Sequence, residues 1–266
     1  MDLFEIIILS IVQGITEFLP VSSSAHLRAT SELLGIYGST LGFDVAVHIG
    51  TLGAVVIYFR RDLARIAVGT TKFMKGTRTE EGILGINLII ATLPVYFVGF
   101  FLRDYIESDL RFIEVIGWTS IVFGILLWWA DRYCMTILTL KHLNYRKAFI
   151  IGLFQIFALI PGSSRAGVTI TAARILGYER MEAARFSMLL SIPAIAGAGT
   201  LVFFDFFSDG NAVVWRSTLL AGVLSFVTAT VAISLLMRWL RYSGFGIFVI
   251  YRILFGTLIL SYAYGF

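Results

Sequence analysis

A polar stretch near the start of this 266-residue chain, Gln13–His26 (QGITEFLPVSSSAH), contains residue types that could carry out chemistry. Glu17 and His26 are ionisable, and such groups cost at least a few kcal/mol inside a membrane, where they usually mark a functional site. Between them lie three consecutive serines, Ser22, Ser23 and Ser24. Gln13 and Glu17 are four residues apart, so on a helix they would share one face. That face could bind a cation or accept a proton; the alternative is a protonated Glu17 that bonds a neighbouring helix.

A second stretch, Pro161–Thr169 (PGSSRAGVT), resembles the first, because both contain the pattern P-x-S-S-x-A. In each copy the small polar residues follow a proline and would open a helix. They are Ser22, Ser23 and Ser24 in the first copy and Gly162, Ser163 and Ser164 in the second. The first N–H groups of a helix are unpaired and carry partial positive charge, which makes them an anion site. Two such ends could hold a doubly phosphorylated group; plain capping of the helices is the alternative.

Arg165 lies inside an apolar part of the chain, too far from its ends to reach water easily. A guanidinium stays charged and needs an anionic partner in such a place. Glu17 could be that partner, and so could a phosphate, which a guanidinium can hold with two parallel bonds. We expect Arg165 to contact Glu17 or Ser23 despite the distance in sequence. A purely structural ion pair with Glu17 is the alternative.

Two histidines fall within apolar stretches. His26 follows Ser23 by three residues, so its imidazole could take a proton from that hydroxyl or from a nearby water. His48 lies near Asp44 on one helical face; a buried, satisfied histidine is the commoner explanation, which gives His48 only a supporting role. Three other charged residues are expected at helix ends near the membrane interface: Arg28, Glu32 and Arg252.

The composition indicates a membrane protein: 58% of residues are hydrophobic and 14% are charged, whereas soluble domains carry about a quarter charged residues. Several apolar runs are long enough to cross a hydrocarbon core of about 30 Å. The shorter alternating segments of an outer-membrane barrel are absent. A single cysteine, Cys134, excludes an intramolecular disulfide and a cysteine metal cluster. We expect no cleavable signal peptide, since no basic region precedes the first apolar stretch.

The apolar runs predict an all-α integral membrane protein with six transmembrane helices and two re-entrant helical hairpins, arranged as two repeats. The first repeat (1–131) has a hairpin at 3–33 and spans at 43–59, 83–101 and 112–130. The second (147–266) has a hairpin at 148–176 and spans at 186–206, 217–237 and 247–264. Paired, interrupted apolar segments at corresponding positions of two halves are typical of a membrane-embedded binding site.

The distribution of basic residues orients this layout. Four connecting segments hold 15 of the 21 Lys and Arg residues: 60–81, 131–147, 174–185 and 238–246. By the positive-inside rule these segments are cytoplasmic. Both termini are then outside, the first hairpin enters from outside and the second from inside, so the repeats are inverted. The net charge of +4 is explained by this bias and indicates no nucleic-acid partner.

The two motifs resemble those of the undecaprenyl-diphosphate phosphatase family of the bacitracin-resistance type. Its (E/Q)-x-x-x-E segment matches Gln13–Glu17, its P-V-S-S-x-x-H stretch matches Pro20–His26, and its P-G-x-S-R-S-x-x-T signature matches Pro161–Thr169. The similarity extends over the whole chain in length and layout. The chain departs from the signature at Ala166, where the family pattern has serine, and it uses the glutamine option at Gln13.

The resemblance implies a bacterial inner-membrane enzyme that hydrolyses undecaprenyl diphosphate to undecaprenyl phosphate, the lipid carrier of cell-wall synthesis. It implies catalytic roles for Glu17, Ser23, His26 and Arg165, phosphate binding that includes Thr169, and a divalent cation, Mg²⁺ or Ca²⁺, on Gln13 and Glu17. Within this hypothesis either Ser23 or a water attacks phosphorus. A transporter or flippase for a polyprenyl phosphate is the competing function, and a membrane scaffold the third. The oligomeric state is open, with a homodimer among the options.

Overall fold

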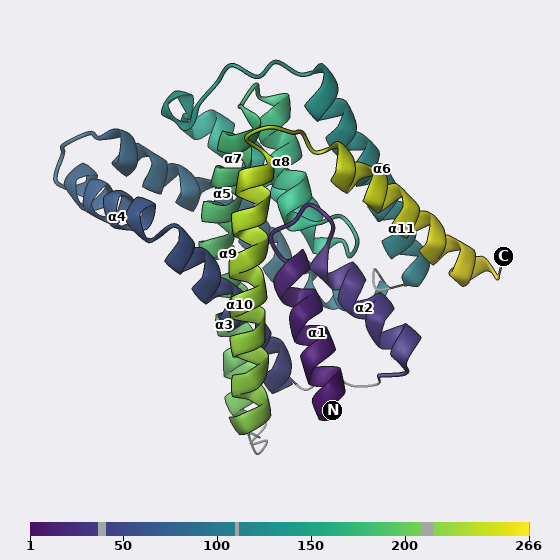
Figure 1. Ribbon diagram of the computed structural model, residues 1–266. Coiled ribbons are helices and arrows are strands. Elements are labelled where there is room, and N and C mark those ends of the chain that lie inside the picture. Colours follow the sequence, from purple (N-terminus) through teal and green to yellow (C-terminus); the bar gives the residue numbers. More distant parts are fainter. Residues whose placement is uncertain (37–40, 110–111, 209–214, 266) are drawn as a thin grey trace.

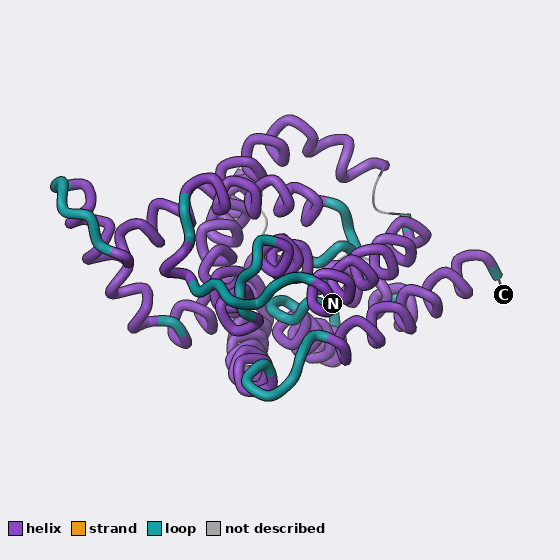
Figure 2. Tube along the Cα trace, turned by 90° about the horizontal axis from the view of Figure 1, so that it is seen from above, coloured by secondary structure: helices purple, strands orange, loops and turns teal. Residues whose placement is uncertain are grey.

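The computed structural model describes residues 1–36, 41–109, 112–208 and 215–265. The first half contains α1 (Leu3–Thr16), α2 (Ser23–Leu34), α3 (Leu41–Tyr58), α4 (Arg60–Met74), α5 (Glu80–Asp109) and α6 (Ile113–Tyr133). The second contains α7 (Tyr145–Gln155), α8 (Arg165–Ile175), α9 (Arg180–Ser208), α10 (Trp215–Trp239) and α11 (Gly246–Tyr264), with short 3-10 helices η1 (Leu140–His142) and η2 (Ile156–Leu159). Figure 2 shows that the described chain consists of helices and loops, so the all-helical prediction is confirmed.

Four predicted spans are confirmed as long apolar helices within α5, α6, α10 and α11. The predicted span 43–59 forms α3, which continues into α4 after a bend of 79°, and only the pair together is long enough to count as a fifth candidate. For the predicted span 186–206, α9 supplies a helix of sufficient length, but the side chains from 198 onward lie outside the described residues. The chain is therefore a multi-pass helical membrane protein.

Two helical hairpins break at the prolines of the two motifs. In the first, α1 and α2 are joined by a turn that contains Pro20; in the second, α7 and η2 lead through Pro161 into α8. A proline supplies no N–H donor and so favours a break at these positions, although α5 and α9 continue through Pro94 and Pro193. Figure 1 shows the α1–α2 turn directed toward the α7–α8 turn at the centre of the molecule. The Ser164 hydroxyl lies 3.5 Å from the carbonyl oxygen of Leu19, so the two turns are in contact.

Each hairpin packs against a long helix from the other half of the chain: α1 against α10, and α7 against α5. A glycine permits the close approach in both places. A Cβ atom on Gly14 would lie 1.9 Å from the Thr228 hydroxyl, and one on Gly152 would lie 2.6 Å from the Ala91 carbonyl oxygen. Small residues at helix crossings are characteristic of membrane bundles, in which close backbone packing replaces the hydrophobic effect. This exchange of partners fixes the two turns relative to each other.

The Asp131 carboxylate at the end of α6 connects three segments that were predicted to be cytoplasmic. It accepts bonds from Arg174 Nε (3.1 Å), Arg180 Nε (2.7 Å) and the backbone N–H of Phe245 (3.2 Å). Arg174 has no exposed surface, so its charge depends on this carboxylate and on the carbonyl of Tyr178. The loops that follow α6, α8 and α10 therefore lie together at one end of the molecule, the top of Figure 1.

Candidate active site

The Glu17 carboxylate is the centre of the polar cluster between the two turns. Its Oε2 atom accepts hydrogen bonds from Ser23 Oγ (2.7 Å) and Gln13 Nε2 (2.9 Å). Its Oε1 atom lies 3.0 Å from Arg165 Nη2. The Glu17 side chain is 8% exposed and that of Arg165 is 16% exposed, so water screens this ion pair weakly. The predicted contact between Arg165 and Glu17, 148 residues apart in sequence, is confirmed.

The backbone places these groups at helix ends. Glu17 ends α1 as its C-cap residue, whereas Ser23 and Arg165 are the first residues of α2 and α8. The residues before them, Ser22 and Ser164, have φ values of 76° and 69°. Such values are uncommon for residues other than glycine and cost of order 1–3 kcal/mol, so they persist where the surroundings enforce them. Each return helix therefore starts after a strained residue that directs its first side chain into the cluster.

Three buried polar atoms of the two hairpins have no hydrogen-bond partner within the described part of the chain: Arg165 Nη1 and Gln13 Oε1, whose side chains bond Glu17, and Ser163 Oγ in the second turn. A buried polar group without a partner costs about 1–3 kcal/mol. One donor and one acceptor beside the carboxylate, and one hydroxyl in the second turn, are thus without a partner. They are available to a ligand that carries oxygen atoms or a cation.

His26 does not contact Ser23. Its Nδ1 atom lies 2.6 Å from the Ser22 carbonyl oxygen and its Nε2 atom lies 2.5 Å from the Tyr251 hydroxyl. The ring also stacks on Phe255, with centroids 4.3 Å apart. A carbonyl can only accept, so Nδ1 carries a proton, and in the neutral ring Nε2 accepts from Tyr251. The expected pairing of Ser23 with His26 is therefore wrong. His26 lies three residues after Ser23 on α2, and its imidazole faces α11. The proton acceptor that Ser23 bonds is Glu17.

The predicted phosphate-binding residues are placed in different ways. Ser22 and Ser24 share a bond between their hydroxyls, 3.2 Å long. The Ser164 hydroxyl accepts from the backbone N–H of Gly167 (3.1 Å) and so caps α8, which makes the N-capping alternative correct for this residue. Thr169 lies one turn further on; its hydroxyl donates to the backbone carbonyl of Arg165 (2.8 Å) and bonds the Ser187 hydroxyl (2.7 Å). It therefore contacts the backbone of Arg165, and among the described residues it has no bond to the Glu17 carboxylate.

Gly162 and His48 also face away from the cluster. A Cβ atom on Gly162 would lie 2.1 Å from the Thr119 hydroxyl of α6, so this glycine allows the turn to approach α6 rather than a ligand. His48 bonds the Asp44 carbonyl oxygen of its own helix at 2.7 Å, and within the described residues it has no hydrogen bond to either turn. The explanation of His48 as a residue satisfied within α3 is therefore favoured over a supporting role.

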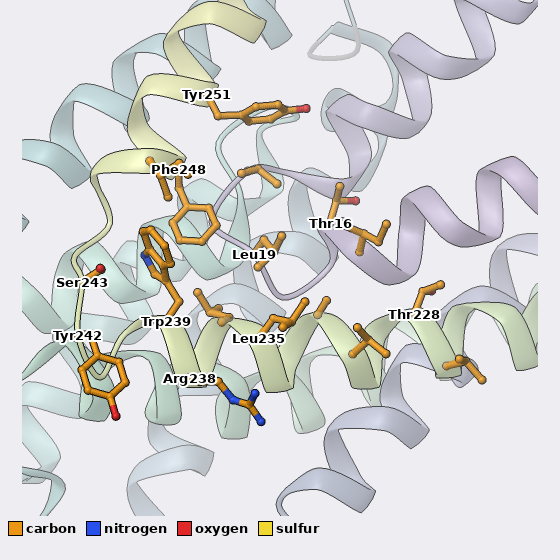
Figure 3. Close-up of a pocket in the computed structure, with 17 residues that line it drawn as sticks. Thr16, Leu19, Thr228, Leu235, Arg238, Trp239, Tyr242, Ser243, Phe248 and Tyr251 are labelled. Atoms are coloured by element: carbon orange, nitrogen blue, oxygen red, sulfur yellow. The ribbon is translucent and has the colours of Figure 1, made fainter.

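An apolar groove begins beside the cluster. It has a volume of about 1020 Å³ and lies between the first turn, α10 and α11. Figure 3 shows Thr16 and Leu19 from the first hairpin, Leu235 and Trp239 from α10, and Tyr251 from α11 around it. Thr16 precedes Glu17 in sequence and Tyr251 bonds His26 of the same hairpin, so the groove lies beside the hairpin that carries Glu17. This arrangement can hold a hydrocarbon chain next to a charged group.

The residues around Glu17 can contribute to a cation site but do not complete one. Among the described residues no group of three His, Cys, Asp or Glu side chains could hold a metal ion. Glu17 supplies one carboxylate, and the unpartnered Gln13 Oε1 supplies a second oxygen. Mg²⁺ in proteins commonly takes one or two carboxylates and completes its shell with water and substrate phosphates. The donor set therefore fits a divalent ion that binds together with a phosphorylated ligand.

Comparisons with known proteins give the family of this chain. Residues 6–258 match the family described as bacitracin resistance protein BacA. The chain belongs to this family. Proteins named undecaprenyl-diphosphatase from Alteromonas mediterranea, Jannaschia sp. and Ruegeria pomeroyi are each 46% identical to it over 267 residues, which covers the full length of both chains.

Within this BacA-family chain, the sequence motifs identified most of the cluster but missed two residues of α11. Tyr251 bonds His26, and Arg252, which we had expected near the interface, has no exposed surface. The sequence feature that could have identified Arg252 is its position six residues inside an apolar run, because a charged residue inside a membrane segment is costly and usually functional.

Replacement of Glu17 by glutamine tests the role of its carboxylate. The substitution keeps the shape but removes the acceptor for the Ser23 proton and the partner of Arg165. We expect turnover to fall by about 10²–10⁴-fold, the usual contribution of a positioned base. Glu32→Gln is the control, since Glu32 pairs with the exposed Arg28 on the same hairpin. If Glu17→Gln and wild type release phosphate at the same rate, the Glu17 carboxylate has no role in the reaction.

Proposed function

We propose that this chain hydrolyses undecaprenyl diphosphate to undecaprenyl phosphate and inorganic phosphate at the Glu17 cluster. The observation that carries the proposal is the bond of 2.7 Å from the Ser23 hydroxyl to Glu17, with Arg165 on the other carboxylate oxygen at 3.0 Å. In this proposal Ser23 is the nucleophile, Glu17 is its base and Arg165 binds the phosphate, with the apolar groove beside them. The three relatives named undecaprenyl-diphosphatase support the same activity and substrate.

In the proposed reaction the Ser23 oxygen attacks the terminal phosphorus while Glu17 accepts its proton. The bond from that phosphorus to the bridging oxygen breaks, and undecaprenyl phosphate leaves with the bonding electron pair. Glu17 passes this proton to the departing undecaprenyl phosphate and is ionised again. Water then attacks the phosphorus of the phosphoserine while Glu17 accepts a proton from it; the bond from phosphorus to the Ser23 oxygen breaks, Glu17 returns the proton to Ser23, and inorganic phosphate leaves. This role of Glu17 replaces the one expected for His26. His26 positions the first turn instead, because it holds the Ser22 carbonyl and is itself held by Tyr251.

Arg165 is proposed to hold the terminal phosphate. Its Nη1 donor has no partner among the described residues and its Nη2 donor bonds Glu17, so one donor of this guanidinium remains for a phosphate oxygen. The unpaired N–H groups at the start of α2 and α8 would add donors on either side. Groups that are already fixed around the developing charge are typically the largest contribution to phosphoryl transfer.

A divalent cation, Mg²⁺ or Ca²⁺, is proposed to bind with the substrate. Glu17 and Gln13 Oε1 would be its protein ligands, and the diphosphate would supply the remaining oxygens. When bound, such an ion neutralises part of the diphosphate charge and stabilises the oxygens that gain charge in the transfer.

The lipid tail is proposed to lie in the groove between the first turn, α10 and α11 (Figure 3). Its lining is apolar over most of its length, with exposed side chains such as Val231 and Leu235 on α10. The tail would leave lipid rather than water, so the groove would hold it by close packing against these side chains and not by the hydrophobic effect. The groove shares Thr16 and Tyr251 with the surroundings of the cluster, so one lipid can occupy both.

We also propose the finer membrane layout: six spans and two re-entrant hairpins in inverted repeats, with both termini outside. The exchanged packing of α1 on α10 and α7 on α5 supports a twofold relation between the halves. The bonds of Asp131, which gather three basic loops at one end, support a common cytoplasmic side. Figure 1 shows the N-terminus toward the opposite end.

Phosphate release from purified protein distinguishes hydrolysis from transport. We expect wild type in detergent to release phosphate from a C55 or C15 diphosphate with Mg²⁺ or Ca²⁺, and to stop when a chelator removes the ion. Gln13→Ala should raise the ion concentration needed for half-maximal rate by about tenfold or more. Gln155→Ala is the control, because Gln155 is an equally buried glutamine in the other hairpin. No release with any divalent ion would favour the transporter.

Trapping of ³²P from substrate labelled at its terminal phosphate tests the covalent route. Acid-quenched wild type should carry label on Ser23, and Ser23→Ala should carry none and lose about 10³-fold or more in turnover, as expected when a nucleophile is removed. Ser234→Ala is the control, since Ser234 bonds only its own helix. A fully active Ser23→Ala protein would establish direct attack by water.

A tryptophan in the groove tests the site of the lipid tail. Val231→Trp should raise KM for the C55 substrate by about tenfold, because overfilling an apolar site costs about 1–3 kcal/mol. Val223→Trp is the control: Val223 is similarly exposed on α10 (50% against 53%) but does not line the groove. If both variants bind the C55 lipid like wild type, the tail lies elsewhere.

A further inference from the structure

Arg252 on α11 is a buried arginine that the proposed chemistry does not use. Its side chain has no exposed surface, and within the described chain no carboxylate pairs with it. Two glycines form the walls around it. A Cβ atom on Gly124 of α6 would lie 3.2 Å from Arg252 Cβ, and one on Gly167 of α8 would lie 2.7 Å from Nη1. The fold thus makes room for a guanidinium at this position.

The guanidinium donates to five backbone carbonyl oxygens from three segments. Nη1 bonds Pro20 in the first turn at 3.2 Å. Nη2 bonds Gly162 at 3.0 Å and Ser163 at 2.9 Å in the second turn. The remaining bonds go to α6: Nε to Ser120 at 3.1 Å and Nη2 to Thr119 at 3.4 Å. One side chain therefore connects the two turns that carry Ser23 and Arg165.

These bonds also set the direction of the backbone at the start of α8. In a planar trans peptide the N–H points opposite to the preceding carbonyl. Because the Ser163 carbonyl faces Arg252, the N–H of Ser164 points away from it, and this N–H has no recorded partner in the described chain. The bond from Arg252 to the Ser163 carbonyl thus fixes the direction of the Ser164 N–H at the start of α8.

A buried charge without an ion-pair partner is costly, and replacing such a group by an apolar one often stabilises a protein. Packing alone therefore does not explain Arg252. The arrangement is explained if both turns must keep a fixed separation around a phosphate, because a misplacement of about 1 Å can cost about 10²-fold in rate.

We propose that Arg252 is a positioning residue for phosphoryl transfer: its five carbonyl bonds hold the two turns so that Ser23 and Arg165 reach the same phosphate. The inference rests on the proposed hydrolysis at the Glu17 cluster. Lysine keeps the charge at this position but has three donors on a single atom and cannot reach all three segments.

The test compares Arg252→Lys with Arg174→Lys, since Arg174 is an equally buried arginine that bonds Asp131 and Tyr178 away from the turns. Arg252→Lys should lower kcat by about 10²-fold and change KM for the lipid by less than about threefold, because the groove is unaltered. Arg174→Lys should lower the detergent unfolding temperature at least as much while its kcat stays within about threefold of wild type. If kcat falls in proportion to the loss of unfolding temperature in both variants, the proposal is wrong.

A second variant leaves the arginine in place. Gly167→Ala should displace the guanidinium, because the added Cβ would lie 2.7 Å from Nη1, and kcat should fall as in Arg252→Lys. The control is Gly69→Ala, which creates a contact of 2.6 Å between α4 and α5. Unchanged kcat in Gly167→Ala, with normal folding, would contradict the positioning role.

Coupling to Arg165 separates positioning from general stability. With Arg165→Lys already present, Arg252→Lys should lower kcat further by less than about threefold, because residues that act as a unit are non-additive. Full additivity of the two losses would mean that Arg252 acts elsewhere. If wild type itself releases no phosphate, the proposed hydrolysis fails; if wild type is active and the variants keep its kcat, only the inference about Arg252 fails.

Discussion

The ion pair between Arg165 and Glu17 is the interaction on which the architecture of the centre depends. A guanidinium in a membrane protein needs a nearby anion, and a carboxylate there needs a donor. Both requirements are met only if the α1–α2 turn and the α7–α8 turn meet, and the ion pair spans 3.0 Å between them. This contact between the turns is possible because the helices break at Pro20 and Pro161, and because glycines let α1 and α7 pack closely against their partner helices. The ion pair is incomplete, since Arg165 Nη1 has no partner in the described chain, which leaves a place for a phosphate oxygen.

Much of this could be predicted from the sequence, because the strongest constraints in a membrane act on residue type. Apolar runs of sufficient length marked α5, α6, α10 and α11. The partner of Arg165 could be predicted because buried charges must pair and few carboxylates lie within apolar segments. The bend between α3 and α4 was harder, since Arg60 and Arg61 ended the predicted span but did not show that the helix would continue along a new direction.

The features that could not be predicted involve the backbone or distant residues. Arg252 bonds backbone carbonyl oxygens. Every residue has one, so the partners of Arg252 cannot be predicted from residue type. His26 bonds Tyr251, 225 residues away, whereas spacing along one helix suggested the nearer Ser23. A third case is the register of the two motifs. The pattern P-x-S-S-x-A aligns Ser23 with Ser164, but the strained residue before the return helix is Ser22 in one copy and Ser164 in the other.

This shift by one residue explains how two similar motifs can form an asymmetric site. Counted from the strained residue, the counterpart of Ser23 is Arg165, and each is the first residue of its return helix. The same backbone position thus presents a hydroxyl from one half and a guanidinium from the other, and both bond the single carboxylate of Glu17. In a repeat that kept the same residue at both positions, two hydroxyls or two cations would face each other. Phosphoryl transfer requires a nucleophile and a cation on the same phosphate, so the difference between the copies is as necessary as their likeness.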